Sequence, residues 1–177
     1  NMTLVYEGEC TPVQGWNMFN IEAAGFEWDG TSNVVIAFQR NNGLWHSSIS
    51  WVRTNTSFVS AIYAHNDAAA YDMTAQSYDI YSYNQVQNRA VTRFVSGDLQ
   101  RNMAANNNGY YHYNHSTNGR NRDEVEVTIG DPTSTTTNSY LPGYSLYEYA
   151  ISQQIYTADE IGTAGTINSL TMWLKNS

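Results

Sequence analysis

The chain of 177 residues is long enough for one sizeable domain, which would bury roughly 70% of its unfolded surface. Eight Lys and Arg residues against sixteen Asp and Glu residues give a net charge of −8, which argues against nucleic acid and anionic membrane surfaces as partners. Asn, Ser, Thr and Tyr fill surface positions in the manner typical of secreted or cell-surface proteins. The single cysteine, Cys10, excludes an internal disulfide, and no apolar run has the length that membrane insertion requires.

Short apolar runs bounded by turn residues predict strands throughout residues 1–97. We expect extended segments around residues 2–8, 16–21, 26–28, 34–38, 45–51, 58–63 and 86–95. The run at residues 34–38 is uniformly apolar and short, which predicts a buried central strand. Cys10 is interpreted as a half-buried strand residue rather than a reactive thiol, because no His or Lys is next to it.

Residues 98–122 are rich in Asn and poor in aliphatic residues, which predicts a linker or a long exposed loop. His112 and His115 are three residues apart, but no third metal ligand accompanies them, so a solvated loop is favoured over a metal site. A Tyr cluster in the same stretch suits either stacking on a ligand or packing against a neighbouring module.

The last portion, residues 123–177, alternates like paired strands, with a single helical turn between them. Thr157 is predicted to cap this turn, Glu160 to complete a capping box and Gly162 to end it. Almost every apolar run of the chain is four to eight residues long. We therefore predict an all-β sandwich with jelly-roll or immunoglobulin-like packing, in which helix is confined to single turns.

The sequences Tyr-Ser-x-Tyr, Gln-Gln-Ile-Tyr-Thr-Ala-Asp-Glu-Ile-Gly and Gly-Thr-Ile-Asn-Ser-Leu occur at residues 144–147, 153–162 and 165–170. These motifs resemble the first half of a repeat module in secreted and surface proteins of anaerobic gut and oral bacteria, related to the cleaved-adhesin jelly-roll domains. Segments within residues 4–36, such as Phe-x-Trp-Asp-Gly-Thr-Ser-Asn, resemble the second half of the same module. The resemblance implies a non-enzymatic structural or adhesive repeat.

The two half-modules stand in reversed order, which divides the chain into residues 1–97, the linker or loop at 98–122 and residues 123–177. A half sandwich exposes apolar surface and strand edges, so it needs a complement. Either the last portion pairs with the first within one chain, or it completes a neighbouring copy and forms a head-to-tail fibre. Neighbouring copies of the chain are therefore expected partners.

Core positions are predicted from the most regular strand patterns. The residues expected mainly in or beside the core are Trp16, Phe19, Trp28, Val35, Phe38, Trp51, Ile155, Ile167 and Leu170.

Catalytic signatures are lacking: the chain has no Gly-x-Ser-x-Gly elbow, phosphate loop, dinucleotide fingerprint or His-rich zinc motif. Two acidic groups would suit a glycosidase pair, Glu7 with Glu9 and the cluster of Asp123, Glu124 and Glu126, but acids on exposed strands are common. We predict no enzyme activity. A secreted glycoside hydrolase or esterase is the third choice of function.

Oxygen ligands for a structural calcium ion are offered by Asp29, Asn33, Asn66, Asp67 and Asp72, and related adhesin sandwiches imply such an ion. Their spacing is not that of a helix-loop-helix calcium loop. A turn closed by side-chain hydrogen bonds to the backbone explains Asp29 better. No other cofactor is expected.

Glycans are the alternative ligand, because five Trp and fourteen Tyr residues supply rings on which sugars stack. The candidates for such a site are Trp45, Tyr110, Tyr111 and Tyr113, which are flanked by Asn, His or Gly. A carbohydrate-binding module is therefore the second choice of function.

Overall fold

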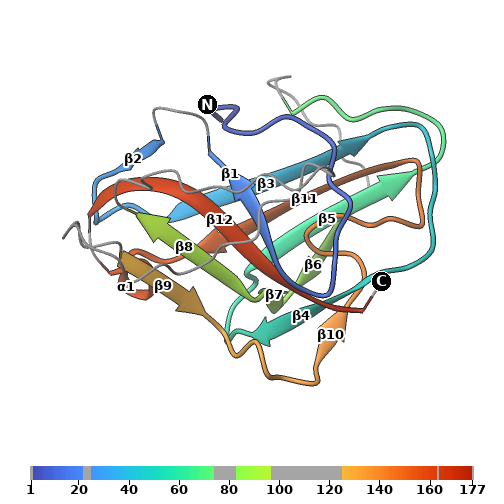
Figure 1. Ribbon diagram of the computed structural model, residues 1–177. Helices are drawn as coiled ribbons and strands as arrows, with labels where there is room; N and C mark the ends of the chain where they lie inside the picture. Colours follow the sequence, from blue (N-terminus) through green and yellow to red (C-terminus); the bar gives the residue numbers. More distant parts are fainter. Residues whose placement is uncertain (1, 22–24, 74–82, 97–124, 163, 177) are drawn as a thin grey trace, which may run out of the picture.

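The computed structural model describes residues 2–21, 25–73, 83–96, 125–162 and 164–176 (Figure 1). Its elements in chain order are β1 (Gly15–Asn20), β2 (Phe26–Trp28), β3 (Val34–Asn41), β4 (Ser50–Asn55), β5 (Ala61–Asn66), β6 (Asn84–Val86), β7 (Asn88–Ala90), β8 (Thr92–Ser96), β9 (Val125–Ile129), β10 (Thr137–Asn138), β11 (Tyr149–Tyr156), α1 (Ala158–Ile161) and β12 (Gly165–Asn176). The predicted linker at 98–122, with His112 and His115, lies outside the described residues.

Two antiparallel sheets make up the fold. The 8-stranded sheet follows the order β10-β4-β12-β8-β9, with β1 and β2 also pairing with β12, and β7 with β4. The 4-stranded sheet follows the order β3-β11-β5-β6. Figure 1 shows β1, β12 and β8 in one layer and β3, β11 and β5 in the other, and α1 is the only helix of the described ranges. These features confirm the predicted all-β sandwich with helix confined to a single turn.

The core lies between the two sheets. Alternation along β12 turns Leu170, Met172 and Leu174 toward this core. Phe19 of β1 pairs opposite Leu170. From the other sheet, Tyr156 of β11 is fully buried in the same core. The buried core residues are Phe19, Ile21, Trp28, Val34, Trp51, Ala90, Phe94, Ile129, Tyr156, Ile161, Ile167, Leu170, Met172 and Leu174. The predicted burial is confirmed for Phe19, Trp28, Trp51, Ile167 and Leu170, and Phe38 packs against this core.

The prediction of a buried central strand at residues 34–38 is wrong. Strand β3 lies at the edge of the 4-stranded sheet, where it pairs with β11 on one side. Val35 pairs opposite Ile155 on the face away from the core, and its side chain is 47% exposed. Ile155 is half-buried on that outer face, and Trp16 is half-buried against Trp173 on the outer face of the other sheet.

The first and last portions of the chain pair within one molecule. Strand β11 lies between β3 and β5, and β12 pairs with β1, β2, β4 and β8. Every one of these contacts joins residues 125–176 to residues 15–96. In the structure, the last portion therefore supplies the central strand of both sheets.

Cys10 does not lie on a strand. It belongs to the segment before β1 and is exposed, so the interpretation of a half-buried strand residue is wrong.

The helical turn α1 begins and ends where the sequence predicts. The side chain of Glu160 accepts a hydrogen bond from the amide of Thr157 at 2.9 Å, as in a capping box, and a second one from the Thr157 hydroxyl at 2.9 Å. Gly162 ends the turn at φ 92°, a conformation that favours glycine, and its amide donates to the carbonyl of Ala158. The predicted roles of Thr157, Glu160 and Gly162 are confirmed.

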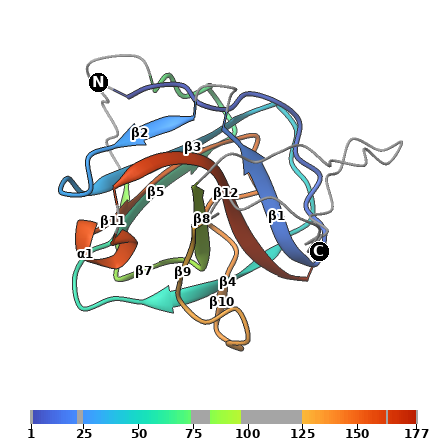
Figure 2. The ribbon, with the colours of Figure 1, turned by 60° about the vertical axis from the view of Figure 1, so that its left-hand side comes forward.

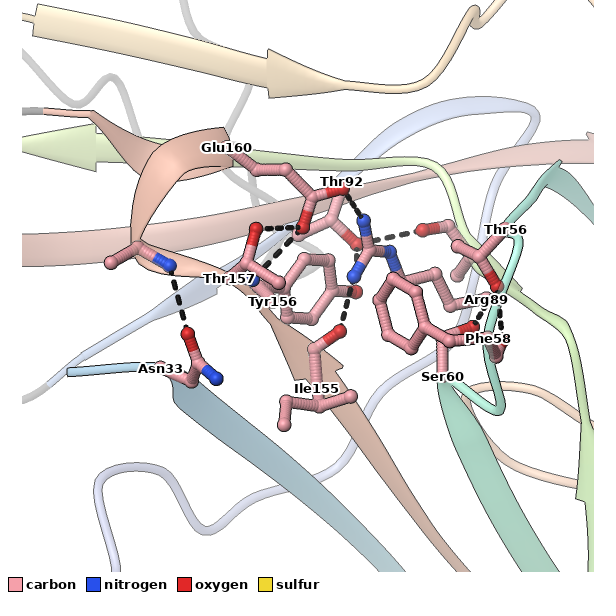
Figure 3. A network of polar contacts seen from close by, with 12 residues as sticks. Asn33, Thr56, Phe58, Ser60, Arg89, Thr92, Ile155, Tyr156, Thr157 and Glu160 are labelled. Carbon is pink, nitrogen blue, oxygen red and sulfur yellow. Dashed lines mark hydrogen bonds and ion pairs between the residues drawn. The ribbon is translucent and has the colours of Figure 1, made fainter.

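A buried ion pair attaches α1 to β7, and Figures 2 and 3 show how these elements meet. The guanidinium of Arg89, 1% exposed, donates to the Glu160 carboxylate and to the Ile155 carbonyl. It also lies 4.4 Å from the centre of the Tyr156 ring, a cation–π contact. Burial raises the pKa of Tyr156 to about 12, although its hydroxyl lies 2.7 Å from that of Thr92. The ion pair and its hydrogen bonds thus join three elements.

Candidate ligand-binding site

Five half-buried aromatic side chains gather at one end of the 4-stranded sheet. We call them the Tyr–His cluster: Tyr63, His65, Tyr140, Tyr144 and Tyr147. The rings of Tyr63 and Tyr140 stack with centres 4.4 Å apart. His65 lies 3.8 Å from Tyr147 and 4.9 Å from Tyr144, measured between ring centres. The cluster joins a strand to a loop that is distant in sequence.

Strand geometry explains the β5 side of the cluster. Residues two apart on a strand share a face, so Tyr63 and His65 point the same way. Tyr63 pairs opposite Ser152 and His65 opposite Ala150 of β11, and both of these partners are buried. The two rings therefore stand on the face of the sheet that turns inward.

Hydrogen bonds fix the loop that carries the three tyrosines. The buried Asn138 accepts a bond from the amide of Leu141 at 2.8 Å, and Leu141 is fully buried. The hydroxyl of Ser152 on β11 donates to the carbonyl of Pro142. The first bond fixes the start of the loop at β10, and the second holds the loop against the inward face of the 4-stranded sheet.

Burial shifts the pKa values of two members of the cluster, His65 and Tyr63. It lowers the pKa of His65, while the nearby Asp67 carboxylate acts in the opposite direction. Burial also raises the pKa of Tyr63, with smaller contributions from Tyr140 and Tyr144. The Nδ1 atom of His65 is buried without a hydrogen-bond partner among the described residues. Burial thus favours the uncharged forms of His65 and Tyr63.

A second segment runs beside the tyrosine loop. The amide of His46 donates to the Ser145 carbonyl at 2.8 Å, and the guanidinium of Arg40 donates to the carbonyls of Leu44 and Tyr147. Arg40 thus joins Leu44 to Tyr147, and His46 is bonded directly to Ser145. The segment before β4 is fixed to the loop at two points.

Trp45 lies between these two points of attachment. Trp45 is 70% exposed, and Leu146, which lies between Ser145 and Tyr147, is 41% exposed. The neighbouring Leu44 is also exposed. The backbone at Trp45 is therefore held in place while its ring is presented to water.

Of the four residues predicted to bind sugars, the structure describes Trp45 only. Tyr110, Tyr111 and Tyr113 lie outside the described residues. Sequence reasoning missed the Tyr–His cluster, although the spacing of three tyrosines within residues 140–147 was visible. That signal was interpreted as strand alternation, whereas β11 begins only at Tyr149.

The first group of predicted metal ligands closes a turn. Asp29 accepts hydrogen bonds from the amides of Thr31 and Ser32, at 2.8 and 2.7 Å, and from the Ser32 hydroxyl at 2.6 Å. The bonds from Ser32, then that from Thr31, lower the pKa of the Asp29 carboxyl. The side-chain oxygen of Asn33 accepts from the amide of Ala158 at 3.1 Å. The turn interpretation of Asp29 is confirmed.

The second group, Asn66, Asp67 and Asp72, lies elsewhere. Asn66 accepts hydrogen bonds from the amides two and three residues further on, and Asp67 accepts one from the amide of Glu148 at 3.0 Å. Asp72 is exposed.

The structure does not bring the two groups together. Val34, next to Asn33, pairs with Tyr156 at one end of β11, whereas Asn66 pairs with Tyr149 at the other end. Within the described ranges, no three His, Cys, Asp or Glu side chains lie close enough to hold a metal ion. Structural calcium stays a prediction.

The carboxylates considered for catalysis are also scattered. Glu7 and Glu9 are exposed in the segment before β1, and Glu126 on β9 lies 3.4 Å from Arg93 of β8. Asp123 and Glu124 lie outside the described residues.

Comparisons with protein-family models, with curated proteins and with solved structures gave no match. Within the described part of the chain, no helix has the length and apolar character needed to cross a membrane.

Proposed function

We propose that the chain is a non-catalytic, extracellular adhesive module that binds carbohydrate at the surface formed by Trp45 and the neighbouring Tyr–His cluster. The observation that carries this proposal is an indole 70% exposed on a segment that hydrogen bonds fix on both sides. A large apolar ring held in water is typical of a binding anchor, and sugars bind by stacking their apolar faces on such rings.

Replacing Trp45 with alanine should weaken glycan binding at least tenfold, because the stacked ring supplies about 1.5–3 kcal/mol of apolar burial. A glycan array with the wild-type protein would identify a ligand, and titration calorimetry would then compare the two proteins. Since Trp45 is exposed, the variant should keep the wild-type unfolding midpoint.

The matched control is Phe58→Ala, which removes another exposed ring, 38% exposed, from the turn before β5. This variant should bind as the wild type does. Absence of binding to every glycan, or equal binding by the Trp45 variant, would contradict the proposed function.

A second candidate function, assembly with neighbouring copies of the chain, is favoured by strand β3. This strand of eight residues pairs with β11 on one side, and its other edge forms no backbone hydrogen bond with the described residues. Its charged residue is Arg40, and exposed Val35 adds apolar surface. Open strand edges of this kind favour pairing with another chain.

If β3 pairs between molecules, the mass measured by size-exclusion chromatography with light scattering should rise with protein concentration. Val35→Lys should reduce this association, because lysine on an edge strand opposes pairing. A constant monomer mass over the whole concentration range would exclude assembly through β3.

A further inference from the structure

The surroundings of the proposed glycan site carry negative charge. Asp67 begins the turn after β5, two residues after His65, and Glu148 follows Tyr147 of the cluster. The amide of Glu148 donates to the Asp67 carboxylate at 3.0 Å, so the two acidic residues lie next to each other. Neither carboxylate forms an ion pair with a described residue. The Asp67 carboxylate thus lies at the backbone of the loop that carries the tyrosines, and Glu148 adds a second acidic residue to that loop.

Positive charge near the site is outnumbered by negative charge. The three stretches that build it, residues 39–47, 63–73 and 140–149, contain one arginine, Arg40, and no lysine. The Arg40 guanidinium donates to the carbonyls of Leu44 and Tyr147, and burial lowers its pKa. Bonds to neutral carbonyls leave its positive charge in place, so the three stretches together carry one positive charge and the three negative charges of Asp67, Asp72 and Glu148.

The two ion pairs among the described residues lie outside the site. Arg89 pairs with Glu160 beside α1, and Arg93 lies over the ring of Trp16 and pairs with Glu126 on the other sheet. The site thus combines aromatic rings with three acidic residues and one basic residue. An anionic sugar there would face the net negative charge of the three stretches.

From this distribution of charge, we infer that the site selects neutral glycans, built from uncharged hexoses, and rejects glycans that carry carboxylate or sulfate groups. The inference rests on the proposed function. Stacking needs only the apolar face of a sugar ring, which neutral and acidic sugars share, so stacking alone does not discriminate. The discrimination comes from placing like charges close together, which is costly in a partly desolvated site.

Matched pairs of glycans test this inference at about pH 7.5, where histidine is largely neutral. One pair is a β-glucan oligosaccharide and the same oligosaccharide oxidised to uronic acid at C6; another is N-acetyllactosamine with and without terminal sialic acid. In each pair that includes a ligand, the neutral member should bind at least about tenfold more tightly at low ionic strength. The difference should shrink at about 1 M salt, where the screening length falls to about 3 Å.

The double variant Asp67→Asn with Glu148→Gln should reduce the difference between the members of a pair, because it removes two of the three negative charges and keeps the acceptor oxygen of residue 67. Asp159→Asn, an exposed acid on α1 at the other end of β11, is the control for loss of charge and should leave the difference unchanged.

The binding results distinguish failure of the neutral-glycan inference from failure of the proposed function. Three results would overturn the neutral-glycan inference and leave the proposed function standing. They are equal binding of both members, tighter binding of the anionic member, and a preference for the neutral member that neither salt nor the double variant changes. Failure of every glycan to bind would overturn both.

Discussion

Leu170→Ala should lower the free energy of unfolding by about 2–5 kcal/mol, because the substitution removes buried methyl groups and leaves a cavity between the sheets. Leu170 is 6% exposed and lies between Phe19 and Phe94 on the neighbouring strands β1 and β8. Two flanking strands restrict the collapse of the cavity. Urea unfolding of the purified domain, followed by tyrosine and tryptophan fluorescence, measures the change.

Val35→Ala is the matched control, since it also shortens an aliphatic side chain on a strand. Val35 is 47% exposed on the edge strand β3, so its truncation should change stability by less than about 1 kcal/mol. Equal losses from both substitutions would contradict the assignment of the two faces of the sandwich.

Glu160→Gln should cost about 3 kcal/mol, because it leaves the guanidinium of Arg89 buried without a counter-charge. This expected loss of stability lies at the lower end of the range for buried ion pairs, because the Glu160 side chain is 32% exposed. Glutamine keeps an oxygen for the capping bonds to Thr157, so the loss reports the ion pair. The effect is measured as the change in urea midpoint. The control is Asp159→Asn, which replaces an exposed acid of the same turn.

The pH dependence gives this prediction a second readout. Burial acts to raise the pKa of Glu160, but the hydrogen bonds from Thr157 and Arg89 outweigh it, so the folded-state pKa is lowered. The ionised form therefore stabilises the fold above the unfolded value of about 4.3, and this contribution is lost as the pH falls through the lowered pKa. Wild-type stability should drop more than that of Glu160→Gln between pH 7 and pH 3. Parallel pH profiles would exclude the ion pair as a source of stability.

Local patterns in the sequence were sufficient for the features that depend on neighbours in the chain. The cap of α1 requires only residues within one turn, and alternation along β12 places Leu170 on one face without knowledge of the other strands. Val35 shows where this reasoning fails. A uniformly apolar run indicates a strand, but the order of strands in the sheet decides whether that strand is central or at the edge.

The candidate site depends on the same long-range order. Tyr63 and His65 meet the tyrosines of residues 140–147 because β5 pairs with β11, the strand that follows the loop. No spacing within either stretch contains this information. Trp45 was identified because its turn-forming neighbours favour exposure, which is again a local property.

The unequal environments of the five tryptophans give the molecule an internal optical reporter. Trp28 and Trp51 are 5% and 2% exposed, and the pair of Trp16 and Trp173 is half-buried, whereas the indole of Trp45 is 70% exposed. Collisional quenchers such as iodide reach the emission of an exposed indole first. Among the five tryptophans, quenching therefore samples Trp45 before the others, and a molecule stacked on this ring would shield it.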